Sequence, residues 1–492
     1  PFKIRRELLY QLGKPCRDPG ERFAERREQR SERRAERREK RQERRVETPE
    51  EIREMHGQLR ALMRALPEPL CAQLVGAVSS GDKTLGKLLA ACAKDPEAAA
   101  RELLFAPLAP LSLDPASARP SLSHAPPAML ETIWRWVSET LAPDIANAMR
   151  SRVADPLAED DPARDDPLRS RLAASMVKAI EAVREDPRAS KQLRHRLGVS
   201  DFRAVLDVAA VLRVAPVVRP ALEGFPATID EMTEERAAMI RDRYDAAYAK
   251  DPDSGVWLLY LLMARLKRPW EILRVFEKIA RRDDDFLLSR TDVAAIGDAM
   301  LEDAAFYLSG FAELPRSLDG ARDAAASLNQ FAQVTVGMTR EIGIRKDGGW
   351  GRQILALRQK AAQQMEAIHA EALTRLDKAV PDPYKPLPAR LKLNGEALEK
   401  AAEKAEILFV FLRLTRDDSA RAAVSGAHAQ VMDRLMQRLD ASAEAILSAL
   451  RAGNAEDDVN ERAAVIARLM TALGQNEPAS VFLRRTAAAR AA

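Results

Sequence analysis

The sequence predicts an all-α protein, a multi-helix bundle or an irregular helical array with a single charged helix at its N-terminus. Apolar side chains recur at helical spacing along most of the 492 residues. The β-branched alternation typical of strands never persists for more than a few residues. With 46% hydrophobic and 31% charged residues and a mean hydropathy of -0.31, the composition excludes a membrane bundle and a wholly disordered chain. The length suggests about two to four packed units.

Residues 1–47 are predicted to form a basic helical arm. Residues 1–45 carry 17 Lys and Arg against 9 Asp and Glu, whereas the rest of the chain is mildly acidic. Within the arm, ERFAERREQRS (21–31) and ERRAERREKRQ (32–42) are copies of an eleven-residue repeat. Eleven residues make three helical turns, so the repeat places Glu and Arg side chains in separate stripes along one straight helix. The remaining column of small side chains cannot form a coiled-coil seam.

The paired arginines of the arm are the candidate binding residues. A charged run of this kind is usually a solvated spacer. Because guanidinium groups pair with carboxylate or phosphate oxygens, binding to a nucleic acid and docking on an acidic protein surface are the two functional interpretations. The interleaved Glu residues oppose binding to a polyanion, and Phe23 is the one aromatic side chain of the repeat. The candidate residues for binding an anion or a partner are Arg26, Arg27, Arg33, Arg34, Arg37, Arg38, Arg44 and Arg45.

A short apolar stripe precedes the repeat and is flanked by Lys3, Arg5 and Arg6. Stripes of this kind pack on their own protein or a subunit, dock on a partner, or make a peripheral contact with an anionic membrane. All three alternatives stay open for residues 1–12. The candidate docking stripe comprises Ile4, Leu8, Leu9 and Leu12.

The body of the protein begins at a capping box. Thr48 and Glu51 can satisfy each other's backbone amides, with a proline at the first helical position. Residues 48–106 are predicted as a small helical module. Residues 107–127 are predicted as a proline-rich linker or extended surface loop, because each proline removes a hydrogen-bond donor and restricts the residue before it.

Residues 128–380 are predicted as a central helical domain that contains an acidic linker over 154–168. The acidic cluster lacks the turn glycine and terminal glutamate of an EF-hand, which argues against a calcium loop. The segment 256–264 is apolar nearly all round, as expected of a helix covered by neighbours. Pro269 is predicted to open the next helix.

Two long helices, 317–344 and 352–379, flank the sequence KDGGWG at 346–351. Its three glycines predict a tight reversal and a helical hairpin with Trp350 near the tip. A phosphate-binding loop is disfavoured, because no strand precedes the glycines and no Gly-Lys-Ser/Thr follows them. Residues 381–492 are predicted as a C-terminal helical domain.

The residues that could carry chemistry are few. Glu366 and His369 have the Glu-x-x-His spacing of carboxylate-bridged di-iron sites, but the second copy that such a site needs is missing. Cys16, Cys71 and Cys92 lie too far apart in sequence for a closed zinc site or a disulfide framework. The sequence contains no HExxH, GxSxG or Walker A motif. We therefore predict no metal, no cofactor and no catalytic residue, and favour a non-enzymatic protein.

Together these features predict a non-catalytic helical scaffold or adaptor that binds protein partners in a larger assembly, with the arm used for docking or anchoring. Two alternatives stay open: a nucleic-acid-associated protein whose arm contacts phosphates, and an unrecognised helical enzyme or metal protein. The N-terminus has no continuous apolar segment, and the longest apolar run, 256–264, is too short to cross a bilayer. We therefore expect a cytoplasmic protein without a transmembrane segment, and the excess of Arg over Lys suggests a bacterial one.

Overall fold

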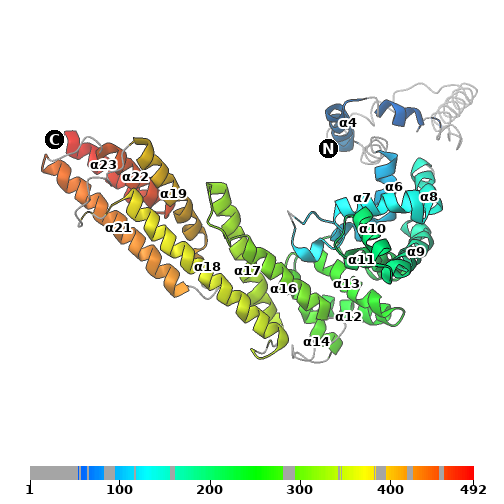
Figure 1. The fold of residues 1–492 in the computed structure, drawn as a ribbon. Coiled ribbons are helices and arrows are strands. Elements are labelled where there is room, and N and C mark those ends of the chain that lie inside the picture. Colours follow the sequence, from blue (N-terminus) through cyan, green and yellow to red (C-terminus); the bar gives the residue numbers. More distant parts are fainter. Residues whose placement is uncertain are drawn as a thin grey trace, which may run out of the picture. The chain divides into compact units, whose positions relative to one another are not determined.

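The fold is all-α, as the hydrophobic periodicity predicts (Figure 1). In a computed structural model, helices account for nearly all regular structure of the described residues, which otherwise contain two isolated bridges, Ser112 with Ser123 and Ile229 with Leu266. The described residues are 54, 57–63, 66–81, 95–115, 118–155, 161–280, 294–341, 344, 346–381, 383, 395–417, 425–453 and 459–491.

The chain divides into two compact units. The first comprises residues 1–99 with 150–160, and the second comprises residues 100–149 with 161–492. The segment boundaries expected from the sequence at 47, 106, 127 and 380 stay predictions. Among the described residues, the first unit contains the helical segment 57–63, α4 (Glu68–Gly81) and parts of α6 (Pro96–Leu104) and α8 (Pro143–Ala154).

The first half of the second unit is a succession of 3-10 turns and helices of up to 19 residues (Figure 1). They are η1 (Ala106–Leu111), η2 (Pro120–Leu122), α7 (Pro127–Trp136), η3 (Val137–Leu141), η4 (Pro162–Asp165), α9 (Asp166–Arg184), α10 (Pro187–Leu197), α11 (Arg203–Ala221), α12 (Glu234–Tyr248), α13 (Pro252–Arg265), η5 (Pro269–Ile272) and α14 (Leu273–Ala280).

The second half of this unit contains longer helices. They are α16 (Ala294–Ser309), α17 (Leu318–Glu341), α18 (Gly349–Ala379), α19 (Gly395–Leu414), α21 (Ser425–Arg451), α22 (Val459–Ala472) and α23 (Asn476–Ala491). In this half α19 packs on α17, α18 and α22, and α21 packs on α18, α22 and α23.

Several helices begin at an Asp-Pro pair. The carboxylates of Asp161, Asp186 and Asp251 accept hydrogen bonds from backbone amides of η4, α10 and α13, and each is followed by a proline at the first helical position. The carboxylate satisfies amides that have no partner within the helix, and proline has no amide to satisfy there. The local sequence thereby fixes where these helices start.

The apolar segment 256–264 forms the central helix α13, which confirms the prediction. Trp257, Leu258 and Met263 are buried, and α13 packs on α11, α12, η5 and α16. Pro269 opens η5, and α14 follows directly. Because side chains on every side of α13 are covered, this helix positions the elements around it.

The glycine-rich turn before α18 has a different role from the tip of a helical hairpin. Helix α17 packs mainly on α16 and α19, whereas α18 packs on α16, α19 and α21. Trp350 is buried against α16, where its Nε1 donates a hydrogen bond to the carboxylate of Asp298 at 2.9 Å. The turn therefore places the indole of Trp350 in the protein interior.

The proline-rich segment is packed rather than extended. Leu108 and Leu111 of η1 are fully buried, and η1 contacts α11 and α13. Ser121 of η2 donates two hydrogen bonds to the buried carboxylate of Asp303 on α16, from its amide at 2.9 Å and its hydroxyl at 2.6 Å. Pro107 and Pro120 stand in the first turns of η1 and η2, a position that needs no donor, whereas Pro110 lies inside η1.

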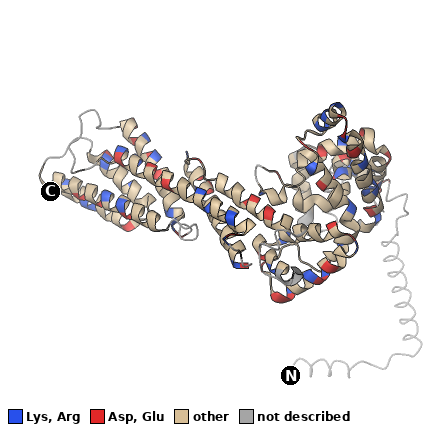
Figure 2. Cartoon of the chain, turned by 60° about the horizontal axis from the view of Figure 1, so that its bottom comes forward, with Lys and Arg blue, Asp and Glu red and all other residues tan. Residues whose placement is uncertain are grey.

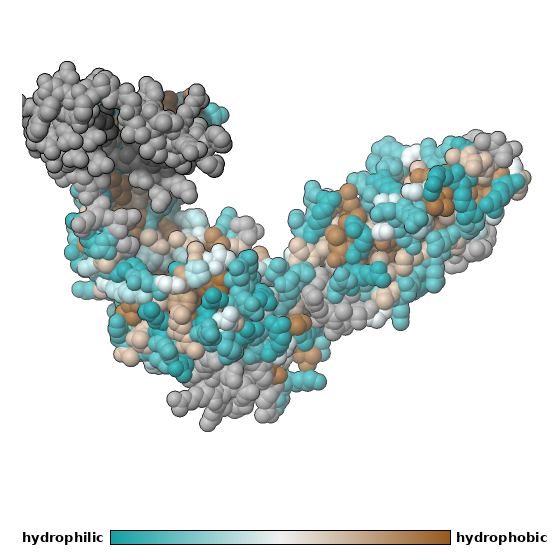
Figure 3. Space-filling model, turned by 180° about the vertical axis from the view of Figure 1, so that it is seen from behind, coloured by the Kyte–Doolittle hydropathy of each residue, from teal (hydrophilic) through white to brown (hydrophobic). Residues whose placement is uncertain are grey.

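The surface of the described helices is mixed in charge. Figure 2 shows Lys and Arg interspersed with Asp and Glu along the outer sides of the helices. In Figure 3 hydrophilic residues dominate the visible face and hydrophobic residues form small patches between them. Within the described ranges, no helix is both long enough and apolar enough to traverse a lipid bilayer.

Candidate functional site

The binding residues predicted for the arm lie outside the described residues, so their arrangement stays a prediction. The same is true of the apolar stripe that precedes the repeat. The residues concerned are Arg26, Arg27, Arg33, Arg34, Arg37, Arg38, Arg44, Arg45, Ile4, Leu8, Leu9 and Leu12.

The described part of the first unit leaves three leucine side chains in solvent. Leu62, Leu70 and Leu74 are 56%, 49% and 38% exposed. Leu70 and Leu74 are one turn apart and share a side of α4. Among the described residues of this unit, Met63 and Cys71 form a buried apolar cluster, against which Leu59, Leu66, Val75 and Val78 pack. We refer to Leu62, Leu70 and Leu74 as the exposed leucines.

Polar contacts join the described segments of the first unit. The Cys71 thiol donates to the carbonyl of Met63 at 2.9 Å. Arg60 donates to the carbonyl of Val153 at 2.9 Å, which connects the segment that carries Leu62 to the end of α8. These contacts involve backbone acceptors, so they constrain the helices without using the side chains of the exposed leucines.

The second unit contains a cavity of about 600 Å³ beside α11. We call it the α11 cavity. Its size lies within the range of about 300–1,000 Å³ that is usual for small-molecule sites. Residues of η1, α9, α11 and α13 line it, together with Asp161 and the segment Leu222–Phe225. The lining is mainly apolar, and the side chains that α11 contributes to this wall are Val211, Val214, Ala215 and Val218.

A buried ion cluster closes one side of the α11 cavity. Arg169 and Arg219 both bind the carboxylate of Asp166, each at 3.0 Å. Arg169 is 2% exposed and also donates to the carbonyls of Leu103 and Leu104. The charges of this side are therefore matched within the protein, and the cluster fixes α9 against α11 and the end of α6.

Arg265 occupies another part of the lining and has different partners. Its guanidinium donates to the backbone carbonyls of Phe225 at 3.1 Å and Leu222 at 3.5 Å. Within the part of the chain that the structure describes, Arg265 forms no ion pair with a carboxylate. Partial burial lowers its pKa, which shows that the surroundings disfavour the charge. Arginine nonetheless stays protonated in proteins, so Arg265 places an unbalanced positive charge at the cavity.

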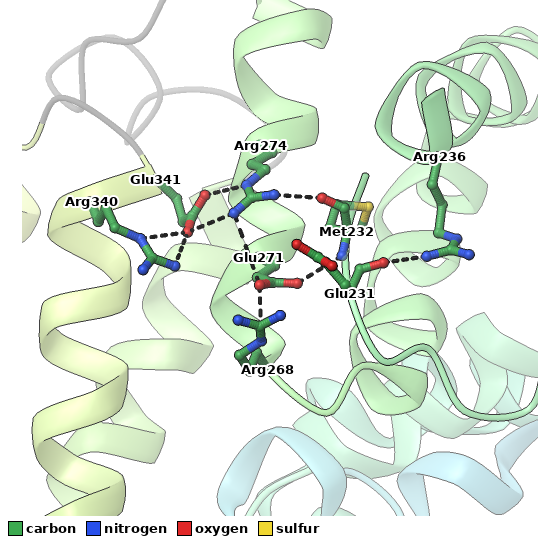
Figure 4. Close-up of polar contacts among 8 residues, drawn as sticks. All are labelled: Glu231, Met232, Arg236, Arg268, Glu271, Arg274, Arg340 and Glu341. Atoms are coloured by element: carbon green, nitrogen blue, oxygen red, sulfur yellow. Dashed lines mark hydrogen bonds and ion pairs between the residues drawn. The ribbon is translucent and has the colours of Figure 1, made fainter. Parts of the chain in front are cut away.

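A second charged cluster lies around Glu271 in η5 (Figure 4). Glu271 is fully buried and accepts a hydrogen bond from the amide of Met232 at 2.8 Å, with Arg268 3.0 Å away. Arg274 bonds both to Glu341 on α17 and to the carbonyl of Met232. Burial alone would raise the pKa of Glu341, but hydrogen bonds from arginines lower it overall. The cluster joins η5, α14 and α17 to the chain before α12, so we assign it a structural role.

The histidine motif found in the sequence does not assemble a metal site with Glu366. That glutamate is exposed, whereas His369 is buried and faces His428 on α21. Across the described ranges, no three side chains from His, Cys, Asp and Glu are grouped so that they could hold a metal ion. His124 is instead surrounded by aromatic rings, with Tyr260 at a centroid distance of 4.7 Å, and lies 3.7 Å from the carboxylate of Asp207.

Sequence reasoning missed the α11 cavity and the cluster beside it. The spacing of Asp165, Asp166 and Arg169 at three and four residues was a usable signal for pairing along one helix. The contacts of Arg219 with Asp166 and of Arg265 with Phe225 gave no comparable signal, because each joins segments more than 35 residues apart in the chain.

Comparison of the chain with protein-family models, with curated proteins and with solved structures finds no match.

Proposed function

We propose that the chain is a non-catalytic helical adaptor, cytoplasmic and bacterial, that binds a protein partner through the exposed leucines together with the arginines of the arm. The observation that carries the proposal is the exposure of Leu62, Leu70 and Leu74 in the described part of the first unit. Exposed apolar side chains gathered on one module are typical of protein-binding surfaces, whereas isolated ones are common on any protein.

The chemistry of the partner follows from the residues that precede the exposed leucines. The arm reaches to residue 47, and residues 1–45 carry 17 Lys and Arg against 9 Asp and Glu. The partner we propose is therefore a protein surface with an apolar groove bordered by Asp and Glu side chains. The leucines supply burial of apolar area, and the arginines supply orientation and a faster encounter.

The test is crosslinking and mass spectrometry in native cells with the full chain. The test variant carries Leu62→Gln, Leu70→Gln and Leu74→Gln, which keep good helix formers at exposed positions. The matched control changes three side chains of similar exposure in the second unit, Met239→Gln, Leu355→Gln and Leu483→Gln, which are 49%, 48% and 44% exposed.

The proposal expects one crosslinked protein that is lost from the leucine variant and kept by the control. It also expects capture to weaken when the eight arm arginines are changed to Gln and when salt is raised, because charge pairs at a surface are screened. Equal capture by both variants contradicts the role of the leucines. Capture that nuclease treatment abolishes overturns the proposal in favour of nucleic-acid binding, and capture with lipid vesicles alone favours a membrane contact.

A further inference from the structure

The α11 cavity offers a binding site that the proposed adaptor function does not use. All its lining residues belong to the second unit, and the exposed leucines belong to the first. The walls combine a long apolar surface with a small number of polar groups, which is the usual make-up of a small-molecule site. Its ligand can therefore be considered independently of any protein partner.

The apolar wall indicates a ligand with a hydrocarbon or aromatic body. Val214 and Val218 of α11 and Leu261 of α13 are each buried to at least 96% and contribute surface to the cavity. Phe225 covers the same space from the chain that follows α11. Because these side chains are already almost fully shielded from water, an apolar ligand body gains mainly van der Waals contact with them.

The polar groups of the cavity indicate the charge of the ligand. Arg169 and Arg219 are matched by Asp166, as described above. The carboxylate of Asp161 accepts the amide of Ala163, and Glu223 lies 3.6 Å from Arg219. Asp161 is exposed and Glu223 is 69% exposed, so water solvates both carboxylates of the lining.

Arg265 differs from these groups. Its contacts with Leu222 and Phe225 use one terminal nitrogen, Nη1, and its acceptors are neutral carbonyls. A guanidinium has five N–H donors and binds a carboxylate through two parallel hydrogen bonds. A half-buried positive charge without a counterion is unfavourable, and an anion at this position would relieve that cost.

We propose that the α11 cavity binds an amphipathic monoanion, a carboxylate with an apolar body, whose carboxylate pairs with Arg265 while the body lies along Val214 and Val218. The site takes a single negative charge, because one unmatched guanidinium faces the cavity and the two lining carboxylates would repel a ligand of higher charge.

The test is isothermal titration of the full chain with sodium decanoate, n-decanol and decyltrimethylammonium, three probes with the same apolar body and different charge. We expect decanoate to bind at one site and to bind about 10- to 100-fold more tightly than decanol, the range for hydrogen bonds to a charged group. Decanol binding as tightly as decanoate, preferred binding of the cation, or no decanoate binding below millimolar concentration would each overturn the proposal.

The variant Arg265→Gln should weaken decanoate binding by the same factor and leave decanol binding unchanged. Its matched control is Arg358→Gln, because Arg358 is also half-buried, also bonded to a backbone carbonyl and also lowered in pKa by burial, but lies on α18 outside the cavity. Equal loss of binding in both arginine variants contradicts the assignment.

A second variant keeps the test decisive if the loss of Arg265 disturbs the fold. Ala106 lines the cavity and is exposed, so Ala106→Trp fills the space from the rim without displacing buried side chains. It should abolish binding of both decanoate and decanol while the circular dichroism spectrum stays that of the parent. Decanoate binding that survives Ala106→Trp places the ligand elsewhere and contradicts the proposal.

Discussion

His369 and His428 face each other between α18 and α21, with 3.2 Å between Nε2 of the first ring and Nδ1 of the second. Both side chains are buried, at 4% and 1% exposure. Burial, and then the neighbouring ring, lower the pKa of His369 from 6.5 to about 4, and burial lowers the pKa of His428. Because the pKa values of both rings lie below the ordinary 6.5, both rings are neutral at pH 7.

This pair makes the fold sensitive to mild acid. The unfolded chain takes up a proton at His369 near pH 6.5, whereas the folded chain does so near pH 4. The contribution of the neutral His369 ring to the free energy of unfolding is therefore full above pH 6.5. This contribution falls by roughly 3 kcal/mol as the pH falls from 6.5 to about 4. The measurement is urea unfolding at pH 7.5 and 4.5 of the parent and of His369→Gln, which should lose less stability on acidification.

The control for acid sensitivity is His195→Gln, because His195 is exposed on α10. This variant should keep the parent's dependence on pH, since the carboxylates that also titrate in acid are common to all three proteins. A His369→Gln variant that follows the parent across the whole range would show that the pair does not set this dependence.

Gly337 on α17 provides space for the indole of Trp270. A Cβ at position 337 would lie well within contact distance of three ring atoms of Trp270. We expect Gly337→Ala to lower the free energy of unfolding by about 1–3 kcal/mol, because a buried indole has to move. Gly426→Ala, in α21 with open space around it, is the opposite case and should stabilise by a few tenths of a kcal/mol. Chemical denaturation of both variants checks the signs, and equal effects would contradict the close packing.

Glu271 holds the cluster that joins η5, α14 and α17. We expect Glu271→Leu to cost about 3–5 kcal/mol of unfolding free energy, because it leaves Arg268 and Arg274 near an apolar site and the amide of Met232 without its acceptor. Glu313→Leu is the comparison, since Glu313 is 86% exposed in its ion pair with Arg316 and should matter by less than about 1 kcal/mol. Guanidinium unfolding curves separate the two, and a small effect at Glu271 would mean that the cluster is solvated.

The sequence predicted those elements whose structure depends on local chemistry. Segment 256–264 is apolar on every side and becomes the buried helix α13, and Pro269 starts η5 because proline suits the first helical position. The burial of residues in the predicted acidic linker depends on distant contacts. The sequence predicts Asp165 and Asp166 as part of a solvated acidic linker. Both are buried instead, because Arg169 and the distant Arg219 cover them.

The candidate cavity could not be predicted for the same reason. Its apolar wall comes from α11, whose valines are indistinguishable in sequence from ordinary core residues. Its charged end depends on where Arg265 meets the carbonyls of Leu222 and Phe225, a contact between segments about forty residues apart. Partners of this kind are set by tertiary packing, which periodicity and capping rules do not describe.

The two hydrogen bonds from Ser121 to Asp303 bear on how the protein can be shortened for experiments. They span 182 residues, so the turn at η2 is an integral part of the core around α16. A fragment designed to begin at α7 would lack Ser121, so the buried carboxylate of Asp303 would lose both hydrogen bonds. The pKa of Asp303 is already raised by burial and would rise further. Expression of such a fragment should therefore yield aggregated material, and a usable truncation begins upstream of η1.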